Sequence, residues 1–134
     1  MGKTGTTVFW LEKTFDETLS LLIEAEQYHA YCFQQQVSHL VPDERLTLTK
    51  ESLRVTSRLS HMVSWLMSEK AILNHEITRQ DFLDLNPPLA DETICTEPAC
   101  DNIKCCPQAL QSLRKRSWEL FMRASRIEGM LRKH

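Results

Sequence analysis

The chain has 134 residues, a formal net charge of −2, and a composition of 42% hydrophobic and 25% charged residues. This length fits a single domain over residues 1–134 whose core needs no disulfide or metal. The nearly balanced charge argues against wrapping of nucleic acid, and no apolar run approaches the ~20 residues that span a bilayer. The N-terminus lacks a signal-peptide pattern, so the sequence predicts a cytoplasmic protein.

The first predicted helix covers about residues 14–40. Thr14 and Glu17 have the spacing of a capping box, in which each side chain bonds the backbone amide of the other residue. We therefore expect residues 1–13 to be flexible and Pro42 to end the helix. Apolar residues follow at helical spacing, at Leu19, Leu22, Ile23, Ala30, Phe33 and Val37.

The second predicted helix covers about residues 49–75, with Thr49 as its cap. Its apolar stripe consists of Val55, Leu59, Met62, Val63, Leu66 and Leu73. The short connector at residues 41–47 predicts that the first two helices pack as antiparallel neighbours. A further short helix is expected after Thr78, whose spacing to Asp81 is that of another capping box, with Phe82 facing inward.

Residues 86–107 differ from the rest of the chain. This segment contains four of the five prolines and four of the five cysteines and has no helical or alternating period, so it predicts a long loop. The last helix is expected at about residues 108–131, after Pro107, a favourable residue for a first helical turn. The chain is thus predicted to be all-α, an antiparallel three-helix bundle with a long loop before its last helix.

The aromatic residues predict a homodimer. One small bundle cannot easily bury Phe9, Trp10, Tyr28, Trp65 and Trp118 together, so a second copy is expected to cover part of them.

The cysteine-rich segment offers the clearest candidate for chemistry. Cys95, Cys100, Cys105 and Cys106 could together hold zinc or an iron–sulfur cluster, or act in redox chemistry. Structural zinc sites usually use two separated C-x2–4-C pairs, and adjacent cysteines seldom both bind one ion. Incidental thiols in a reducing cytoplasm are the competing interpretation, and no cofactor is expected.

Other catalytic patterns are weaker. Glu26 and His29 form the E-x-x-H spacing of di-iron helical proteins, but the second helix offers no matching motif and only Glu128 on the last helix is a loose candidate. No serine, cysteine or histidine lies in a recognisable nucleophile motif. The sequence therefore predicts a protein without enzyme activity.

One face of the second helix is the main candidate for an interaction surface. Arg54, Arg58, His61 and Trp65 follow helical spacing, and arginine and tryptophan often anchor interfaces with a partner or a second copy. In the competing interpretation the arginines pair with acids of the first helix and Trp65 fills the core. The basic last helix also leaves a helical nucleic-acid-binding regulator open, although no helix-turn-helix is visible.

The same helix carries a family resemblance. Residues 52–67 read SLRVTSRLSHMVSWLM and resemble the central helix of the alphaproteobacterial regulator of CtrA degradation family, RcdA, which follows the pattern S-x-R-x-T-x-R-L-x-x-x-x-S-W-L-L. The sequence RIEGML at residues 126–131 is similar to the end of that family's closing helix. The residues that match the central pattern are Arg54, Thr56, Arg58, Leu59, Ser64, Trp65 and Leu66. The cysteine-rich segment departs from the family's pattern.

The resemblance implies a dimer of three-helix bundles that acts as a non-enzymatic adaptor. Such an adaptor brings substrates such as the cell-cycle regulator CtrA to the ClpXP protease, and a response-regulator-like protein takes part in loading it. The physical mechanism is tethering, which raises the effective concentration of the substrate at the protease. A metal- or redox-responsive helical module built on the cysteines is the main alternative, beside the nucleic-acid-binding regulator.

Overall fold

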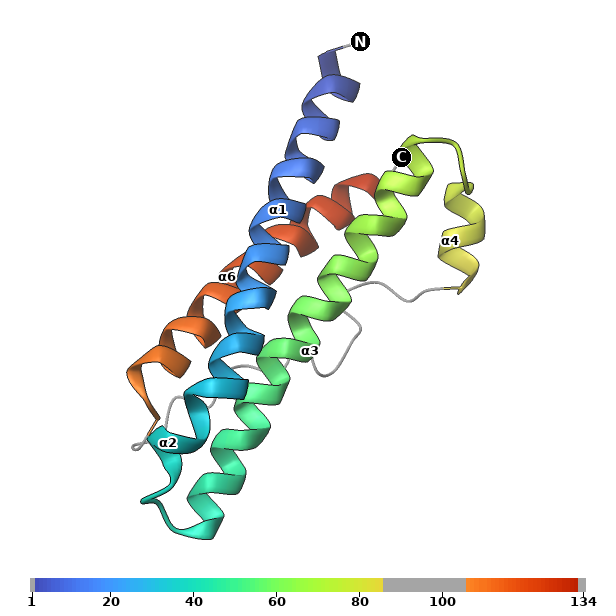
Figure 1. Cartoon of the computed structure of the whole chain (residues 1–134). Coiled ribbons are helices and arrows are strands. Elements are labelled where there is room, and N and C mark those ends of the chain that lie inside the picture. The colour runs from blue at the N-terminus through green and yellow to red at the C-terminus, as the bar shows by residue number, and fades with distance from the viewer. Residues whose placement is uncertain (1, 86–105, 133–134) are drawn as a thin grey trace.

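The computed structural model describes residues 2–85 and 106–132, and every regular element in this part of the chain is an α-helix (Figure 1). The prediction of an all-α protein is confirmed for these residues, which form the three long helices and the short helix after Thr78 that were expected, together with one further short helix. The helices are α1 (Gly2–Tyr31), α2 (Phe33–Val37), α3 (Pro42–Leu73), α4 (Arg79–Leu85) and α6 (Gln108–Arg132). The predicted cysteine-rich loop lies largely outside the described residues.

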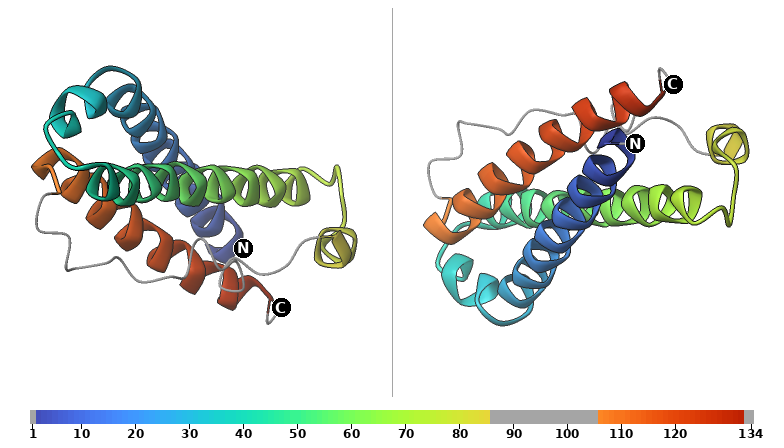
Figure 2. Two further views of the ribbon diagram at one scale, coloured as in Figure 1. Left: turned by 90° about the horizontal axis from the view of Figure 1, so that it is seen from below. Right: turned by 90° about the horizontal axis from the view of Figure 1, so that it is seen from above.

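The three long helices pack against one another (Figure 2). α1 and α3 run side by side in opposite directions, as the short connector between them predicts, and α6 crosses both on one side (Figure 1). α6 points the same way as α3, so the expectation of a wholly antiparallel arrangement is wrong for this pair. α4 lies beside the end of α3, apart from the other helices.

The first helix begins at Gly2, not at Thr14, and residues 2–13 are helical where flexibility was predicted. Thr14 is buried inside the helix, and its carbonyl accepts a hydrogen bond of 2.7 Å from the Thr18 hydroxyl. Threonine makes this bond to the carbonyl four residues back within helices as readily as it caps them. The capping-box spacing of Thr14 and Glu17 was therefore misleading.

The boundary between the first two long helices also differs from the prediction. Cys32 interrupts the first helix, and α2 continues only to Val37. Pro42 begins α3 and does not end its predecessor, since proline suits the first turn of a helix. Asp43 and Glu44 in that turn favour the start electrostatically, and the hydroxyl of Thr49, the predicted cap, bonds the carbonyl of Arg45 within the helix.

The end of α3 is a Schellman motif with His75 in the left-handed conformation, at φ 62°. The amide of His75 donates to the carbonyl of Ile72, and the amide of Glu76 donates to the carbonyl of Ala71. Thr78 then caps α4 by accepting a hydrogen bond from the amide of Asp81, as predicted. Histidine is an unusual choice at this position, where most helices carry glycine.

We expect His75→Gly to raise the free energy of unfolding by about 1 kcal/mol, because glycine avoids the steric cost of a side chain in the left-handed region. The side chain of His75 is exposed, so little packing is lost. Urea unfolding measures the change. Asn74→Gly is the matched control, since Asn74 has a φ of −86° and gains nothing from glycine. Equal destabilisation by both substitutions would contradict the expectation.

The core lies between α1, α3 and α6. Its largest fully buried apolar side chains are Phe33, Phe121, Leu11, Leu48, Leu59, Met62, Leu66 and Leu110. The predicted stripe of the second helix is largely confirmed, because Val55, Leu59, Met62 and Leu66 are all buried. No helix in the described ranges has the length and apolar character that a membrane crossing requires.

Candidate interaction surface

The four residues predicted to form a surface on α3 do not share one environment. Arg58 and Trp65 are 2% and 4% exposed, whereas His61 is exposed and Arg54 is half-buried. The prediction of a common outer face is therefore wrong for Arg58 and Trp65. The competing interpretation, in which Trp65 fills the core, describes the structure better.

Arg58 joins α3 to α6 inside the protein. Its Nη1 donates a hydrogen bond of 2.8 Å to the hydroxyl of Ser117, and its guanidinium lies 5.2 Å from the centre of the Trp118 ring. Arginine suits such a position because its planar group can stack on an aromatic ring while it donates hydrogen bonds. One of the two arginines of the resemblance motif thus joins α6 to α3.

A second polar cluster lies nearer the start of α6. Glu51, which is 5% exposed, accepts from Arg54 at 3.0 Å and lies 3.3 Å from Arg114, a buried arginine of α6. Arg114 also approaches the Cys106 sulfur at 4.0 Å. Both clusters place arginine between α3 and α6, so the two helices are joined by polar contacts as well as by apolar packing.

A third cluster attaches α4. Both Nη atoms of Arg79 donate to the carboxylate of Glu69, at 2.8 and 2.7 Å, and Glu69 is 1% exposed. This hydrogen bond is the main cause that raises the pKa of Arg79, and the nearby charge of Glu128 on α6 adds to it. Phe82 of α4 is buried in the hydrophobic core, as predicted. Arg79 and Phe82 therefore hold the short helix in place.

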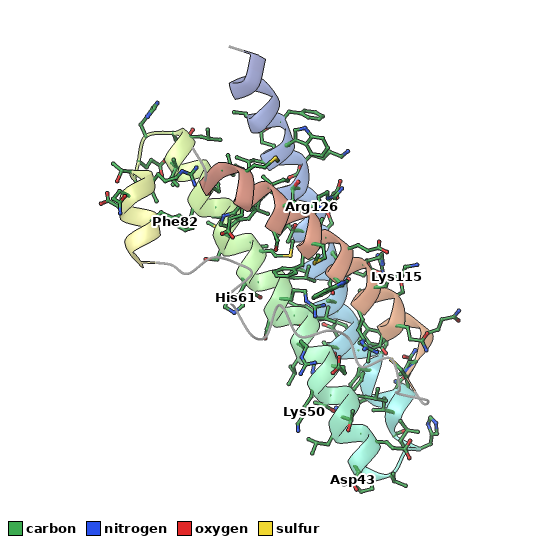
Figure 3. The ribbon with its side chains drawn as sticks, turned by 180° about the vertical axis from the view of Figure 1, so that it is seen from behind. Asp43, Lys50, His61, Phe82, Lys115 and Arg126 are labelled. Carbon is green, nitrogen blue, oxygen red and sulfur yellow. The ribbon has the colours of Figure 1, made fainter. Side chains whose placement is uncertain are left out.

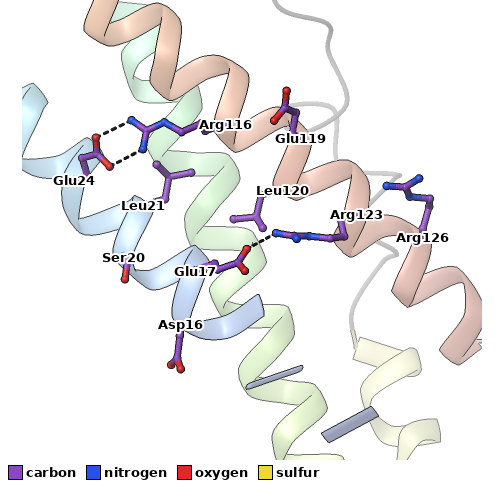
Figure 4. Close-up of a pocket in the computed structure, with 10 residues that line it drawn as sticks. All are labelled: Asp16, Glu17, Ser20, Leu21, Glu24, Arg116, Glu119, Leu120, Arg123 and Arg126. Carbon is purple, nitrogen blue, oxygen red and sulfur yellow. Dashed lines mark hydrogen bonds and ion pairs between the residues drawn. The ribbon is translucent and has the colours of Figure 1, made fainter. Parts of the chain in front are cut away.

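A hollow on the surface lies between α1 and α6 (Figure 4). We call it the α1–α6 groove. It has a volume of about 650 Å³, and the buried side chains of Leu21 and Leu120 lie within it. Its other lining residues are Asp16, Glu17, Ser20, Glu24, Arg116, Glu119, Arg123 and Arg126.

Two ion pairs cross the α1–α6 groove. Arg116 binds both carboxylate oxygens of Glu24, at 2.9 and 2.7 Å, and Arg123 pairs with Glu17. The two acids on α1 are seven residues apart, about two helical turns, and so are the two arginines on α6. Because α1 and α6 run in opposite directions, each carboxylate meets one guanidinium across the groove. Hydrogen bonding to Arg116 lowers the pKa of Glu24, but both pairs are partly exposed and each adds little to stability.

Of the predicted metal and redox candidates, the structure describes only Cys106. Its thiol is buried, and burial raises its pKa, which disfavours the reactive thiolate. Cys95, Cys100 and Cys105 lie outside the described residues. Within the described ranges, no group of three or more histidines, cysteines or acids could hold a metal ion.

The E-x-x-H pair does not form the arrangement of a di-iron protein in the described residues. His29 Nδ1 is 2.7 Å from the hydroxyl of Ser52, and its ring stacks on Phe33 at 5.3 Å. Glu26 is exposed, and Glu128, the other candidate ligand, is buried near Arg79 at the far end of α3. His29 therefore serves the packing of α1 on α3.

Tyr28 predicts a pH dependence of stability. Burial raises the pKa of its hydroxyl to about 12, and the hydroxyl donates to Gln36 at 2.6 Å. The folded state holds this proton more tightly than the unfolded chain does. The protonated hydroxyl therefore contributes fully to the free energy of unfolding below about pH 10, and this contribution is lost as the pH rises toward 12. Across this pH range, the free energy of unfolding measured in urea should fall less for Tyr28→Phe than for the wild type. Identical slopes would contradict this assignment.

Sequence reasoning missed the residues that line the α1–α6 groove. Glu17 was interpreted as part of a cap, and Glu24, one of the acids of the first helix, pairs with Arg116. A usable signal was present, because acids seven residues apart on one helix match arginines seven residues apart on another. Of the five aromatic residues behind the dimer prediction, Tyr28 and Trp65 are buried within one copy, whereas Phe9 and Trp10 are 63% and 41% exposed.

The fold and the groove define an all-helical protein with an open, charged depression between two of its long helices. The chain matches the family model of the protein of unknown function DUF1465 over residues 4–134, and it belongs to this family. No curated protein and no solved structure matches the chain.

Proposed function

We propose that the protein is a cytoplasmic, non-enzymatic adaptor of the RcdA type, built as a dimer of three-helix bundles, which tethers a CtrA-like transcription regulator to the ClpXP protease. The resemblance of residues 52–67 and 126–131 to the RcdA family supplies this function. The structure adds that both stretches belong to one packed unit, since they lie in α3 and α6 and Arg58 bonds Ser117 between these helices. This contact is the observation that most supports the proposal.

Tethering needs surface that is not used for folding. Several large apolar side chains are at least 40% exposed on the long helices, and they include Phe9, Trp10, Ile23, Leu53, Met67 and Met130. Together with the charged α1–α6 groove they provide separate places for a substrate and for a protease assembly. A metal- or redox-responsive role would depend on Cys95, Cys100 and Cys105, which are outside the described residues.

Affinity capture from native lysate, followed by mass spectrometry, tests the adaptor role. Co-capture of an unfoldase–protease, a single-domain response regulator or a CtrA-like transcription regulator is the expected result. Recovery of the bait alone, under conditions that preserve known adaptor complexes, would contradict the proposal.

The proposed dimer has a suitable seam on the outer face of α3. Leu53 and Met67 are 49% and 58% exposed, and only uncharged residues lie along the face between them, including Ser60 and Ser64. Two copies packed in opposite directions about Ser60 would bring Leu53 of one beside Met67 of the other, which satisfies two-fold symmetry. The serines leave room for close approach of the helices.

Sedimentation equilibrium tests this seam. Ser60→Arg places a charge at the two-fold centre and should convert the dimer to a monomer, whereas Gln34→Arg on the exposed face of α2 should leave it unchanged. A wild-type protein that is monomeric, or a Ser60→Arg variant that stays dimeric, would remove this part of the proposal.

A further inference from the structure

The short helix α4 presents a cation and an aromatic ring to the rest of the protein. Of the four α4 side chains that the structure describes, Gln80 and Asp81 are exposed, whereas Arg79 is half-buried and Phe82 is 4% exposed. Figure 3 shows Phe82 on the side of α4 that faces α3 and α6. Arg79 and Phe82 are three residues apart and therefore share one face of the helix. The face by which α4 is held is thus an Arg-x-x-Phe motif.

The surface that α4 covers belongs to the ends of α3 and α6. We call it the α4 socket and identify it by Glu69 of α3, which binds Arg79, and by Glu128 of α6, whose charge acts on Arg79. The same two helix ends carry apolar residues that are only partly buried against the core, namely Ile72, Leu73, Ile127 and Leu131. The α4 socket therefore combines a buried carboxylate with apolar surface.

The buried carboxylate determines which cation the α4 socket accepts. Glu69 is 1% exposed, and a carboxylate that is so deeply buried needs a cation that also satisfies its oxygens with hydrogen bonds. Arg79 bonds both oxygens, at 2.8 and 2.7 Å. Arginine makes this paired contact because its guanidinium is planar, whereas lysine acts as a point charge. A ligand of the socket therefore needs an arginine, with an aromatic residue one helical turn away.

The helix α4 can be exchanged for another ligand because few contacts attach it. It has only seven residues, too few for a stable helix on its own, and it makes fewer contacts with the described chain than the long helices make with one another. Residues 74–78, which connect it to α3, are exposed throughout, and His75 among them has the sterically unfavourable φ of 62°. A second helix that supplies an arginine and an aromatic ring restores what detachment of α4 removes.

We infer that the α4 socket is a binding site for a helical segment of a partner protein that carries an Arg-x-x-Phe motif, and that α4 occupies this site as a competitor from within the chain. Binding of a helix in a groove is a common mode of recognition. Because α4 is tethered, its effective concentration is high, and a partner must be in excess or be held nearby by another contact. The inference deepens the proposed adaptor role, on which it rests, by giving the chemistry of one partner segment and a means of regulating it.

A synthetic peptide of residues 77–85, added to the full chain, tests this inference. The full-chain variant Phe82→Ala empties the aromatic position of the socket and keeps Arg79 as the partner of Glu69. The peptide should bind this variant about tenfold more tightly than the wild type, because the resident α4 competes less well. At 15.6 kDa the protein suits amide chemical-shift mapping by NMR, which should show shifts at residues 69–73 and 127–131.

Altered peptides supply the matched comparison. Peptides that carry Arg79→Ala or Phe82→Ala should each bind about tenfold more weakly than the parent peptide. A peptide with Asp81→Asn should bind like the parent, because Asp81 is exposed on α4. No binding of the parent peptide to the folded variant, equal binding of the parent and Phe82→Ala peptides, or shifts confined to other residues would overturn the inference.

Hydrogen exchange on the wild type gives a second measurement that does not depend on the folding of the variant. In excess parent peptide, amides of residues 79–82 should lose protection while those of α1, α3 and α6 keep it, because the peptide displaces α4. Unchanged protection of residues 79–82 at saturating peptide would contradict displacement. Neither assay contains a protease, so peptide binding without delivery of substrate to ClpXP would contradict the adaptor role alone, and delivery without peptide binding would contradict this inference alone.

Discussion

Arg79→Ala is expected to lower the free energy of unfolding by about 3 to 5 kcal/mol, among the largest effects of any single substitution in this protein. Glu69 is 1% exposed, and both of its carboxylate oxygens accept from Arg79. Removal of the guanidinium leaves this buried charge without its main compensation. The helix α4 should detach at the same time.

Urea unfolding at neutral pH measures this effect. Hydrogen exchange should show loss of protection in residues 79–82 before global unfolding. Arg45→Ala on the exposed face of α3 is the control, with little expected change. A deficit below about 1 kcal/mol for Arg79→Ala would show that α4 is not held by this pair.

Arg58→Ala is expected to destabilise the protein by about 3 kcal/mol. The substitution removes the hydrogen bond to Ser117 and the stacking on Trp118, and it leaves a cavity between α3 and α6. Arg58→Met should cost less, since methionine fills much of the same space without a buried charge. Chemical unfolding followed by circular dichroism measures both variants.

This experiment also separates a role in the core from a role at a surface. If Arg58 were a contact for partners, Arg58→Ala would fold with unchanged stability and lose only binding. Lys50→Ala, eight residues earlier on an exposed face of the same helix, provides the comparison for a surface cation. Equal stability of the two variants would contradict the position of Arg58 between the helices.

Periodicity predicted the helices well, because burial of Val55, Leu59, Met62 and Leu66 requires one continuous apolar stripe. The ends were less predictable. Thr14 and Thr49 resemble caps in sequence but lie inside helices, and Pro42 suits either the end of one helix or the start of the next. Only the three-dimensional context decides between such alternatives.

The candidate surface was harder to predict because a polar residue on a helix does not reveal whether its face is exposed. Arg58 and Trp65 share a face with His61 by spacing, yet α6 covers Arg58 and leaves His61 in solvent. The α1–α6 groove depends on Glu17, Glu24, Arg116 and Arg123, which meet only when α1 and α6 pack. The pattern within one helix does not show such long-range pairing; only a comparison of the seven-residue spacings on the two helices could have suggested it.

The most direct test of the adaptor role is reconstituted proteolysis of a CtrA-like transcription regulator by purified ClpXP and a response-regulator-like protein, with and without this chain. The proposal predicts faster degradation at low substrate concentration, through a lower KM, because tethering raises the effective concentration of substrate at the protease. An unchanged rate at every substrate concentration would contradict the proposed function.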